Sequence, residues 1–120
     1  MDLSIEVVPT IVDRVEEVLL LARDGGRTVG SVGIKFEKRC AFMRRLFVAD
    51  DCRRRGVGAS LLRRATDEAC RLGKESLGLV VEATNEDAIR LYRRFDFIIG
   101  HEYDDGTFSM FKPLVVGSGY

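Results

Sequence analysis

The segment Leu46–Gly58, LFVADDCRRRGVG, joins an apolar, strand-like run to a helical pattern that continues to Leu72. Its two glycines, Gly56 and Gly58, allow the backbone to approach a ligand closely. The first free N–H groups of the following helix point at such a ligand, with the positive end of the helix dipole behind them. The arginines Arg53–Arg55 oppose that dipole unless a bound polyanion compensates them. The segment therefore predicts a phosphate cradle between a strand and a helix.

Ordinary explanations of the hexapeptide Arg53–Gly58 remain open. Runs of arginine are usually solvated, and a Gly-x-Gly triplet occurs by chance in many loops. The segment is not a Walker loop, because no Gly-Lys-Ser/Thr follows the glycines. It is not the dinucleotide motif Gly-x-Gly-x-x-Gly either, because position 61 is Leu. The hexapeptide alone does not distinguish a phosphate cradle from a solvated loop, so the rest of the sequence is needed.

Length and composition indicate one ordinary globular domain. The 120 residues leave room for a single domain, residues 1–120, with one modest core. Hydrophobic residues make up 46% of the chain and charged residues 32%, and 19 basic residues balance 19 acidic ones. General nucleic-acid binders carry a basic excess, so the neutral total argues against nucleic acid as a partner. A local patch of Arg44, Arg45 and Arg53–Arg55 is the feature that would support one.

The cysteines carry no sign of a metal site or of a disulfide framework. Cys40, Cys52 and Cys70 are odd in number, lack metal-type spacing and follow no apolar N-terminal segment. We expect reduced thiols in a cytoplasmic protein and no bound metal. No stretch approaches the roughly 20 apolar residues that cross a bilayer. A soluble protein without a membrane partner is therefore expected.

The first half of the chain is typical of antiparallel strands in succession. Ile11, Val15, Val18 and Leu19 have helical spacing, but Leu19–Ala22 before Asp24-Gly25-Gly26 is equally typical of a strand that enters a turn. We expect a short helix followed by a strand, and the glycines then indicate a hairpin. The expected elements are a strand at Ser4–Val8, a helix at Val12–Glu17, a strand through Ala22, and strands at Thr28–Phe36 and Cys40–Val48.

The second half alternates between helices and strands. A helical apolar period runs from Gly58 to Leu72, with Gly73 as the residue that ends the helix. The continuous apolar run Leu77–Val81 predicts a strand that is covered on both faces and parallel to the strand before the cradle. The remaining expectations are a helix capped by Thr84 or Asn85 that ends near Asp96, a hairpin of Phe97–Tyr103 and Phe108–Leu114, and a loose tail at Val116–Tyr120.

Two motifs in the correct order identify a family resemblance. Arg53-x-x-Gly56-x-Gly58 resembles the acetyl-CoA pyrophosphate loop of the GNAT superfamily of N-acetyltransferases, Arg/Gln-x-x-Gly-x-Gly/Ala. The run Asn85-x-x-Ala88-x-x-Leu91-Tyr92-x-x-x-x-Phe97 resembles the second signature of that family, Asn-x-x-Ala-x-x-Leu-Tyr-x-x-x-Gly-Phe. The matching region extends from about Val29 to Leu114.

The resemblance implies a fold and a reaction. The fold is of the mixed α/β class: a single domain with a central, mostly antiparallel mixed sheet flanked by helices, here with a shortened N-terminal helical region. The implied reaction is direct transfer of an acetyl group from acetyl-CoA to the primary amine of a small molecule or a peptide. A non-catalytic acyl-CoA-binding or regulatory module is the alternative.

The resemblance also assigns residues that bind the co-substrate. The pantetheine arm would add to the strand before the loop, because a splay between parallel strands leaves backbone groups unpaired. Main-chain amides from Arg54 to Ala59 would hold the pyrophosphate, and an arginine among Arg53–Arg55 would add charge-assisted bonds to it or to the ribose phosphate. Asn85 would contact the pantetheine arm or acetyl end, or else simply cap its helix. The assigned residues are Leu46, Phe47, Val48, Arg53, Arg54, Arg55, Gly56, Val57, Gly58, Ala59 and Asn85.

Catalytic groups follow from the same resemblance. Tyr92 is the candidate acid for the leaving thiolate, since a phenol with a pKa of ~10 is protonated at neutral pH; the competing interpretation is a core aromatic residue. The N–H of Val48 would polarise the thioester carbonyl. Glu82 is the candidate base, with His101 as a second choice. Acidic residues near the acceptor mouth would suit a cationic amine, or are ordinary surface groups: Glu82, Glu102, Asp104 and Asp105.

The sequence departs from the family pattern at three places. Asp96 stands where glycine is usual, although Asp tolerates a left-handed backbone better than most residues. Ala49-Asp50 replaces a frequent proline. The segment before Ala22 is too short for the two helices that usually form one wall of the acceptor pocket. We therefore expect either an open groove for a peptide or protein amine, or a pocket completed by a second subunit in a homodimer.

Overall fold

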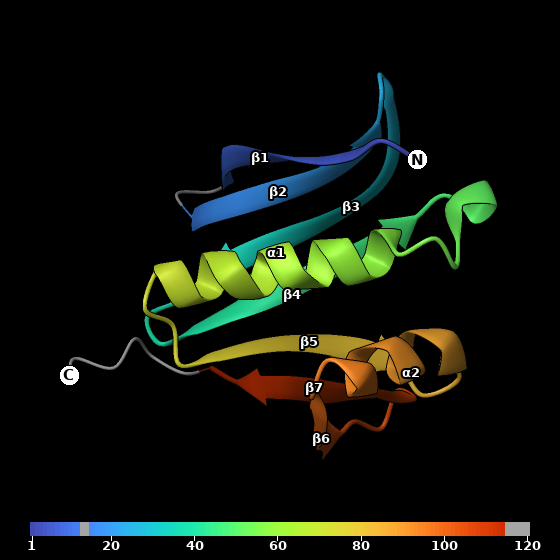
Figure 1. Ribbon diagram of the computed structural model, residues 1–120. Helices are drawn as coiled ribbons and strands as arrows, with labels where there is room; N and C mark the ends of the chain where they lie inside the picture. Colours follow the sequence, from blue (N-terminus) through green and yellow to red (C-terminus); the bar gives the residue numbers. More distant parts are fainter. Residues whose placement is uncertain (13–14, 115–120) are drawn as a thin grey trace.

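The long helix Val57–Arg71 (α1) lies across one face of a seven-stranded sheet in the computed structural model, which describes residues 1–12 and 15–114 (Figure 1). A shorter helix, Glu86–Arg94 (α2), lies on the same side of the sheet, and a 3₁₀ turn, Asp50–Cys52, precedes α1. The strands are Leu3–Val12 (β1), Val15–Asp24 (β2), Arg27–Phe36 (β3), Cys40–Val48 (β4), Ser76–Glu82 (β5), Ile98–Glu102 (β6) and Thr107–Pro113 (β7).

The sheet is mixed and mostly antiparallel, as the sequence predicts. Its strand order is β1-β2-β3-β4-β5-β7-β6. The first four strands form an antiparallel meander, and β5 joins β4 in the parallel direction through α1. β7 inserts between β5 and β6 and is antiparallel to both. This topology confirms the expected fold class.

The N-terminal region corrects one sequence expectation. A helix at Val12–Glu17 is wrong, because β1 continues to Val12 and β2 begins at Val15; residues 13–14 lie outside the described residues. A helix of six residues does not recover the cost of its nucleation, whereas β1 and β2 pair from Leu3↔Asp24 to Val12↔Val15. The predicted first strand and the strand through Ala22 are confirmed with longer bounds.

The core is one cluster on the helix side of the sheet, which lies between α1 and the first four strands and continues to β5, β7 and α2. Leu61, Leu62 and Ala65 of α1 are fully buried, as are Leu20 and Ile34 of the sheet. Close approach requires a glycine at position 30, where a Cβ would lie 2.8 Å from Val57 Cγ1. Such burial contributes about 25 cal/mol per Å² of apolar surface. The apolar period of α1 therefore anchors it firmly to the meander.

Gly73 ends α1, as predicted. It has φ 72°, and its N–H donates to the Cys70 carbonyl at 3.0 Å. The N–H of Lys74 donates to the Ala69 carbonyl, also at 3.0 Å, which completes a Schellman motif. Among the described residues, neither helix has the length and apolar character needed to cross a bilayer.

The face of the sheet opposite the helices is open, which corrects a second expectation. Val80 of β5 pairs with Ser109 and is 59% exposed, while Leu79 and Val81 lie on the helix side and are buried. The strand is therefore covered on one face and not on both. Phe47, Phe111 and Ile98 add exposed apolar surface to the molecule. The predicted homodimer stays a prediction.

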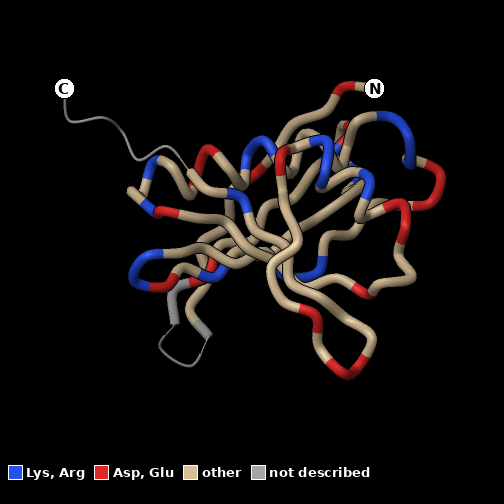
Figure 2. The backbone as a smooth tube through the Cα atoms, turned by 90° about the horizontal axis from the view of Figure 1, so that it is seen from below, with Lys and Arg blue, Asp and Glu red and all other residues tan. Residues whose placement is uncertain are grey.

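The C-terminal elements agree with the sequence. Asn85 caps α2 by accepting a bond from the Ala88 N–H at 3.2 Å, and Asp96 follows the helix with φ 69°, a left-handed conformation. The β6–β7 hairpin is present, and the tail Val116–Tyr120 lies outside the described residues. Figure 2 shows acidic and basic residues interspersed along the chain, in keeping with a net charge of zero.

Candidate functional site

β4 and β5 separate after a short parallel contact. They pair only at Cys40↔Ser76, Ala41↔Leu77 and Phe42↔Gly78. Arg45 has φ 56°, and the β3–β4 register shifts at the same level, so a bulge turns the rest of β4 away from β5. Facing backbone groups beyond this point have no partner across the gap within the described strands. The gap can accept an extended ligand as an added strand.

The loop before α1 presents backbone donors beside this gap. Arg54 has φ 64° and Gly56 has φ 83°, so two left-handed residues turn the chain into the helix. The Ser60 N–H donates to the Gly56 carbonyl at 3.0 Å, but no described partner satisfies the N–H groups of Val57, Gly58 and Ala59. The first turn of α1 has neither a side-chain cap nor an acidic residue. This arrangement suits a bound anion.

An ion pair fixes the loop to the β2–β3 hairpin. Both terminal nitrogens of Arg27 donate to the Asp51 carboxylate, each at 2.7 Å. The Arg27 hydrogen bond lowers the pKa of Asp51 to about 2. The Ala49 N–H also donates to the Val29 carbonyl at 2.8 Å. The sequence offered no sign of this attachment, because the partners are far apart along the chain.

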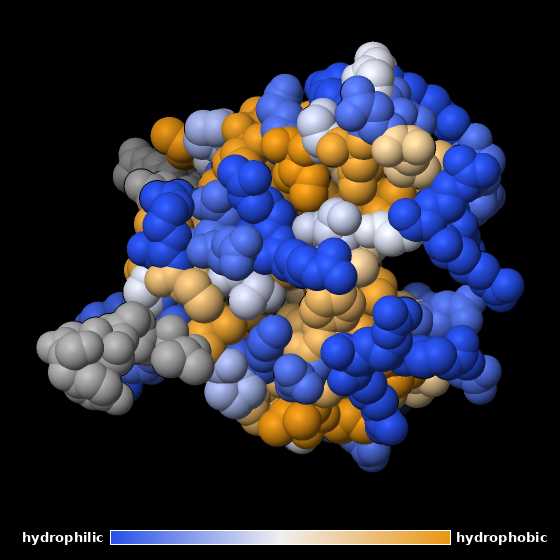
Figure 3. All heavy atoms as spheres, in the orientation of Figure 1, coloured by the Kyte–Doolittle hydropathy of each residue, from blue (hydrophilic) through white to orange (hydrophobic). Residues whose placement is uncertain are grey.

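The gap and the loop form one cleft together with α2. Its volume is about 590 Å³. Figure 3 shows the surface hollowed on the right of the view, between the loop and α2. β4, the loop and the start of α1 form one wall, and α2 forms the other. The predicted residues that line it are Leu46, Val48, Arg53, Arg54, Gly56, Val57, Gly58, Ala59 and Asn85.

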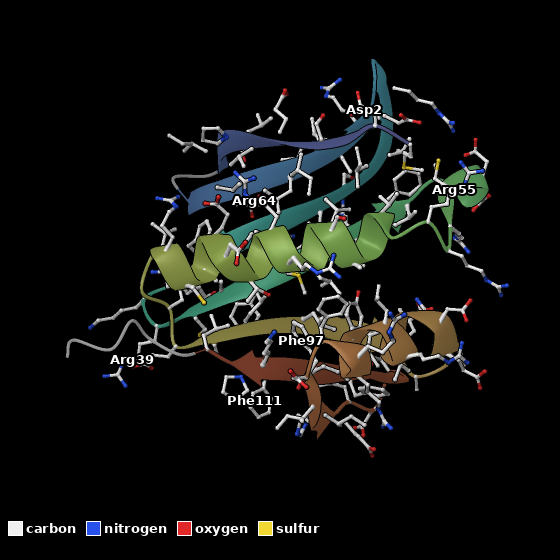
Figure 4. All side chains as sticks on the ribbon, in the orientation of Figure 1. Asp2, Arg39, Arg55, Arg64, Phe97 and Phe111 are labelled. Atoms are coloured by element: carbon white, nitrogen blue, oxygen red, sulfur yellow. The ribbon has the colours of Figure 1, made fainter. Side chains whose placement is uncertain are left out.

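Two predicted co-substrate residues do not line the cleft. Phe47 pairs with Ser31, lies on the open face of the sheet and is 54% exposed. Successive side chains of a strand point to opposite faces of the sheet, so Phe47 points away from the face that carries Leu46 and Val48. Arg55 is exposed on the loop that leads into α1, where Figure 4 labels it.

The cleft also contains residues that were not predicted from the sequence to contact the co-substrate, although Ala88 and Leu91 belong to the second motif. Most lie on α2, at positions that recur with the helical period and therefore share one side of that helix. That spacing was visible in the sequence, but the direction of the helix face was not. The missed residues are Cys52, Asp87, Ala88, Arg90, Leu91 and Arg94.

The two glycines have different roles. A Cβ at Gly58 would lie 3.1 Å from Leu91 Cδ2 and 3.7 Å from Val48 Cγ2, so this glycine lets the two walls approach. A Cβ at Gly56 would meet nothing within 4 Å, but its φ of 83° disfavours any other residue. Gly58 therefore keeps space, and Gly56 permits the turn.

Tyr92 belongs to the core side of α2. It is 7% exposed, and its ring centroid lies 5.8 Å from that of Phe97. It does not line the cleft, although its neighbour Leu91 does. Burial raises the pKa of its phenol, so the hydroxyl is protonated at neutral pH. The role of Tyr92 as the acid stays a prediction, and the alternative is that Tyr92 is only a core aromatic residue.

The candidate base and the other acidic residues predicted near the acceptor mouth lie outside the cleft. Glu82 is exposed and pairs with Thr107, on the open face of the sheet with Val80. His101 is exposed on β6, and its ring stacks edgewise on Tyr103 at 4.6 Å. Asp105 accepts bonds from both the N–H and the hydroxyl of Thr107, so it stabilises its own turn. In the described part of the chain, no group of three or more His, Cys, Asp or Glu residues could hold a metal.

Comparisons with known proteins identify the family. The model of the acetyltransferase (GNAT) family matches residues 4–97. A mycothiol acetyltransferase from Clavibacter michiganensis subsp. michiganensis is 40% identical over 92 residues, which are 71% of this chain and 30% of that protein. The chain thus spans about 30% of the length of the curated relatives it matches.

Solved structures share the fold. The ribosomal-protein-S18-alanine N-acetyltransferase from Escherichia coli has a TM-score of 0.75 at 24% identity, over 87% of this chain and 74% of that one. An N-acetyltransferase from Thermoplasma acidophilum, solved in complex with coenzyme A, has a TM-score of 0.76 at 22% identity, over 81% and 60% of the two chains. With the family model and both sequence motifs in agreement, the chain belongs to the acetyltransferase (GNAT) family.

Proposed function

We propose that the chain binds acetyl-CoA in the cleft and transfers the acetyl group to a primary amine. The observation that carries this proposal is the convergence of the β4–β5 gap and the free N–H groups of α1 on one cleft. The gap accepts an extended arm, and the helix terminus accepts phosphate. CoA contains both groups, because an extended pantetheine arm is joined to a pyrophosphate in one molecule.

Residues on the β4 side would hold and activate the thioester. Main-chain N–H groups of Val57, Gly58 and Ala59 receive the pyrophosphate, and the pantetheine arm runs beside Leu46 and Val48. The Val48 N–H donates to the thioester carbonyl and stabilises the oxyanion that develops there. Asn85 retains its amide NH₂ for the arm while its oxygen caps α2.

The two proton transfers would take place on opposite sides of the sheet, with Glu82 on the open face and Tyr92 on the helix side. The amine nitrogen forms a bond to the acetyl carbon as the C–S bond breaks. Glu82 or a water accepts the amine proton on the open face, and the protonated Tyr92 hydroxyl donates a proton to the sulfur. An amine that approaches from the open face meets Glu82 before it reaches the gap, because both lie at the same end of β5.

Two acceptors are candidates. The open sheet face near Val80 and Phe47 has no helix over it in the described residues, which favours an extended polypeptide that carries the amine. Small ligands usually need a concave site that encloses most of their surface. The second candidate is a small-molecule acceptor such as the one that the name mycothiol acetyltransferase implies, and it is favoured by the 40% identity to that relative.

A non-catalytic acyl-CoA-binding module is the second candidate function. It is favoured by the positions of Tyr92 and Glu82, neither of which lines the cleft. Catalysis would then require a shift of α2 or of the acceptor, whereas binding of CoA alone would not.

Calorimetric titration with acetyl-CoA tests the proposal, with ATP and NAD as polyphosphate controls. Selective micromolar binding supports it, and release of free CoA thiol in the presence of amines then separates the enzyme from the binding module. A folded protein that binds none of the ligands, or binds all of them alike, would contradict the proposal.

A further inference from the structure

The α2 wall of the cleft carries charge that the pyrophosphate site does not use. Asp87, Arg90 and Arg94 all line the cleft from α2, opposite Arg53 and Arg54 of the loop. Arg90 and Arg94 are four residues apart, so they are neighbours along one side of the helix. The cleft is therefore basic on both walls, with four arginines and one aspartate among its lining residues.

Local ion pairs leave much of this charge uncompensated. Arg90 contacts Asp87 at 3.3 Å, and Arg53 contacts Asp50 at 3.3 Å, in pairs that are largely exposed. Exposed pairs of this kind are weak. For Arg54 and Arg94, no carboxylate within 4.0 Å is found in the described part of the chain. Like charges that face each other across a cleft repel one another, and bound anionic groups relieve that repulsion.

The helix dipole explains only part of this arrangement. Arginines near a helix C-terminus are stabilised by it, and both Arg93 and Arg94 lie in the last turn of α2. Arg93, however, lines a separate depression with Asp96 and Ile99. The dipole therefore accounts for arginines at this end of α2, and it does not account for Arg90, or for the direction in which Arg94 lies.

The chemistry of CoA provides a second anion. Besides its pyrophosphate it carries a phosphomonoester on the ribose, which holds a charge of roughly −1.5 to −2 at pH 7 because its second pKa is about 6. Arginine recognises phosphate through a planar fork of donors. A pyrophosphate held by the loop wall leaves this phosphomonoester for the opposite wall.

We infer that Arg90 and Arg94 bind the ribose 3′-phosphate and make the cleft prefer CoA to dephospho-CoA. This inference rests on the proposed function, because it requires CoA in the cleft. It makes the two arginines determinants of co-substrate specificity. Arg93, in the same helical turn but outside the cleft, takes no part.

Titration of CoA and dephospho-CoA into three proteins tests the inference: the unaltered chain, the double variant Arg90→Gln/Arg94→Gln, and the control Arg93→Gln. We expect the unaltered chain and the control to bind CoA roughly tenfold or more tightly than dephospho-CoA, as one or two charge-assisted bonds provide. The double variant should bind both ligands alike, with an affinity for dephospho-CoA within about twofold of the unaltered chain. Binding of dephospho-CoA also shows that the variant is folded.

Three results would overturn the inference. If the unaltered chain binds both ligands equally, the 3′-phosphate is not recognised, although the proposed function stands. If the preference survives in the double variant, other residues read the phosphate. If neither ligand binds to the unaltered, folded chain, the proposed function and this inference are both wrong.

Discussion

The two walls of the cleft differ in how firmly the fold holds them. α1 buries Leu61, Leu62 and Ala65 among other residues against the meander, whereas Tyr92 is the buried residue of α2. The two parts of the sheet meet where β4 and β5 pair over only three positions. The α1 wall, here called the firm wall, is therefore anchored to the shared core at many buried positions, whereas the α2 wall, the lighter wall, is anchored at few. A ligand that touches both walls should stabilise their relative position.

The largest expected effect is on the firm wall. Leu62→Ala should lower the free energy of unfolding by about 2–5 kcal/mol, because the side chain is fully buried. Ile89→Ala on α2, where the side chain is half-buried, should cost under about 1.5 kcal/mol. Urea unfolding of both variants measures the difference. Equal losses would show that the two walls are held alike.

Tyr92→Phe removes the hydroxyl of Tyr92 and keeps its ring, so it separates the chemical role of this residue from its packing role on the lighter wall. Turnover of an amine should fall by roughly 10²-fold if the hydroxyl protonates the thiolate. Stability and acetyl-CoA affinity should change little, since the ring that packs on Phe97 remains. Because burial raises the phenol pKa, activity that depends on this proton should persist to pH values above those of an exposed tyrosine. Unaltered turnover would return Tyr92 to a core role.

Gly58→Ala tests the space between the walls. Alanine improves helix propensity by about 1 kcal/mol, so the variant should be as stable as the parent or more so. Its Cβ, 3.1 Å from Leu91 Cδ2, should displace the Leu91 side chain by a few tenths of an ångström and narrow the cleft, so CoA binding should weaken by about two- to threefold. Gly56→Ala is the matched variant, because it should lose stability by roughly 1–2 kcal/mol through its left-handed backbone. Unchanged affinity in Gly58→Ala would show that the close approach is unimportant.

The smallest effect concerns the ion pair that attaches the loop to the firm wall. The folded pKa of Asp51 is about 2, below the ordinary 3.8, so the pair stabilises the protein above pH 3.8 and loses its contribution as the pH falls toward 2. Asp51→Asn should flatten the decline of Tm between about pH 4 and pH 2, most clearly at low salt. An identical decline in the variant would mean that the pair does not stabilise the fold.

The sequence predicted the firm wall better than the lighter one. β4 was predicted with its observed bounds, and α1 to within one residue, because apolar periodicity and terminal glycines such as Gly73 are local signals. The loop residues that line the cleft followed from the same local motif. These features depend little on the packing of distant segments.

The features that the sequence did not predict depend on tertiary packing. Nothing marks Arg45 as the left-handed residue of a bulge, so the depth of the β4–β5 gap could not be inferred. Arg90 and Arg94 belong to the cleft only because of the way α2 docks. The helix at Val12–Glu17 failed because strand pairing overrode a weak helical period. Strand alternation could have excluded Phe47 from the cleft.

Backbone hydrogen exchange with and without saturating acetyl-CoA tests most directly whether one ligand bridges the two walls. We expect slower exchange at the unpaired N–H groups of Val57–Ala59 on one wall and at the amides of α2 on the other, and also at facing amides of Leu46–Val48 and Leu79–Glu82, with no change in the β1–β2 pair. Protection confined to another surface, or binding without protection at these amides, would contradict the account.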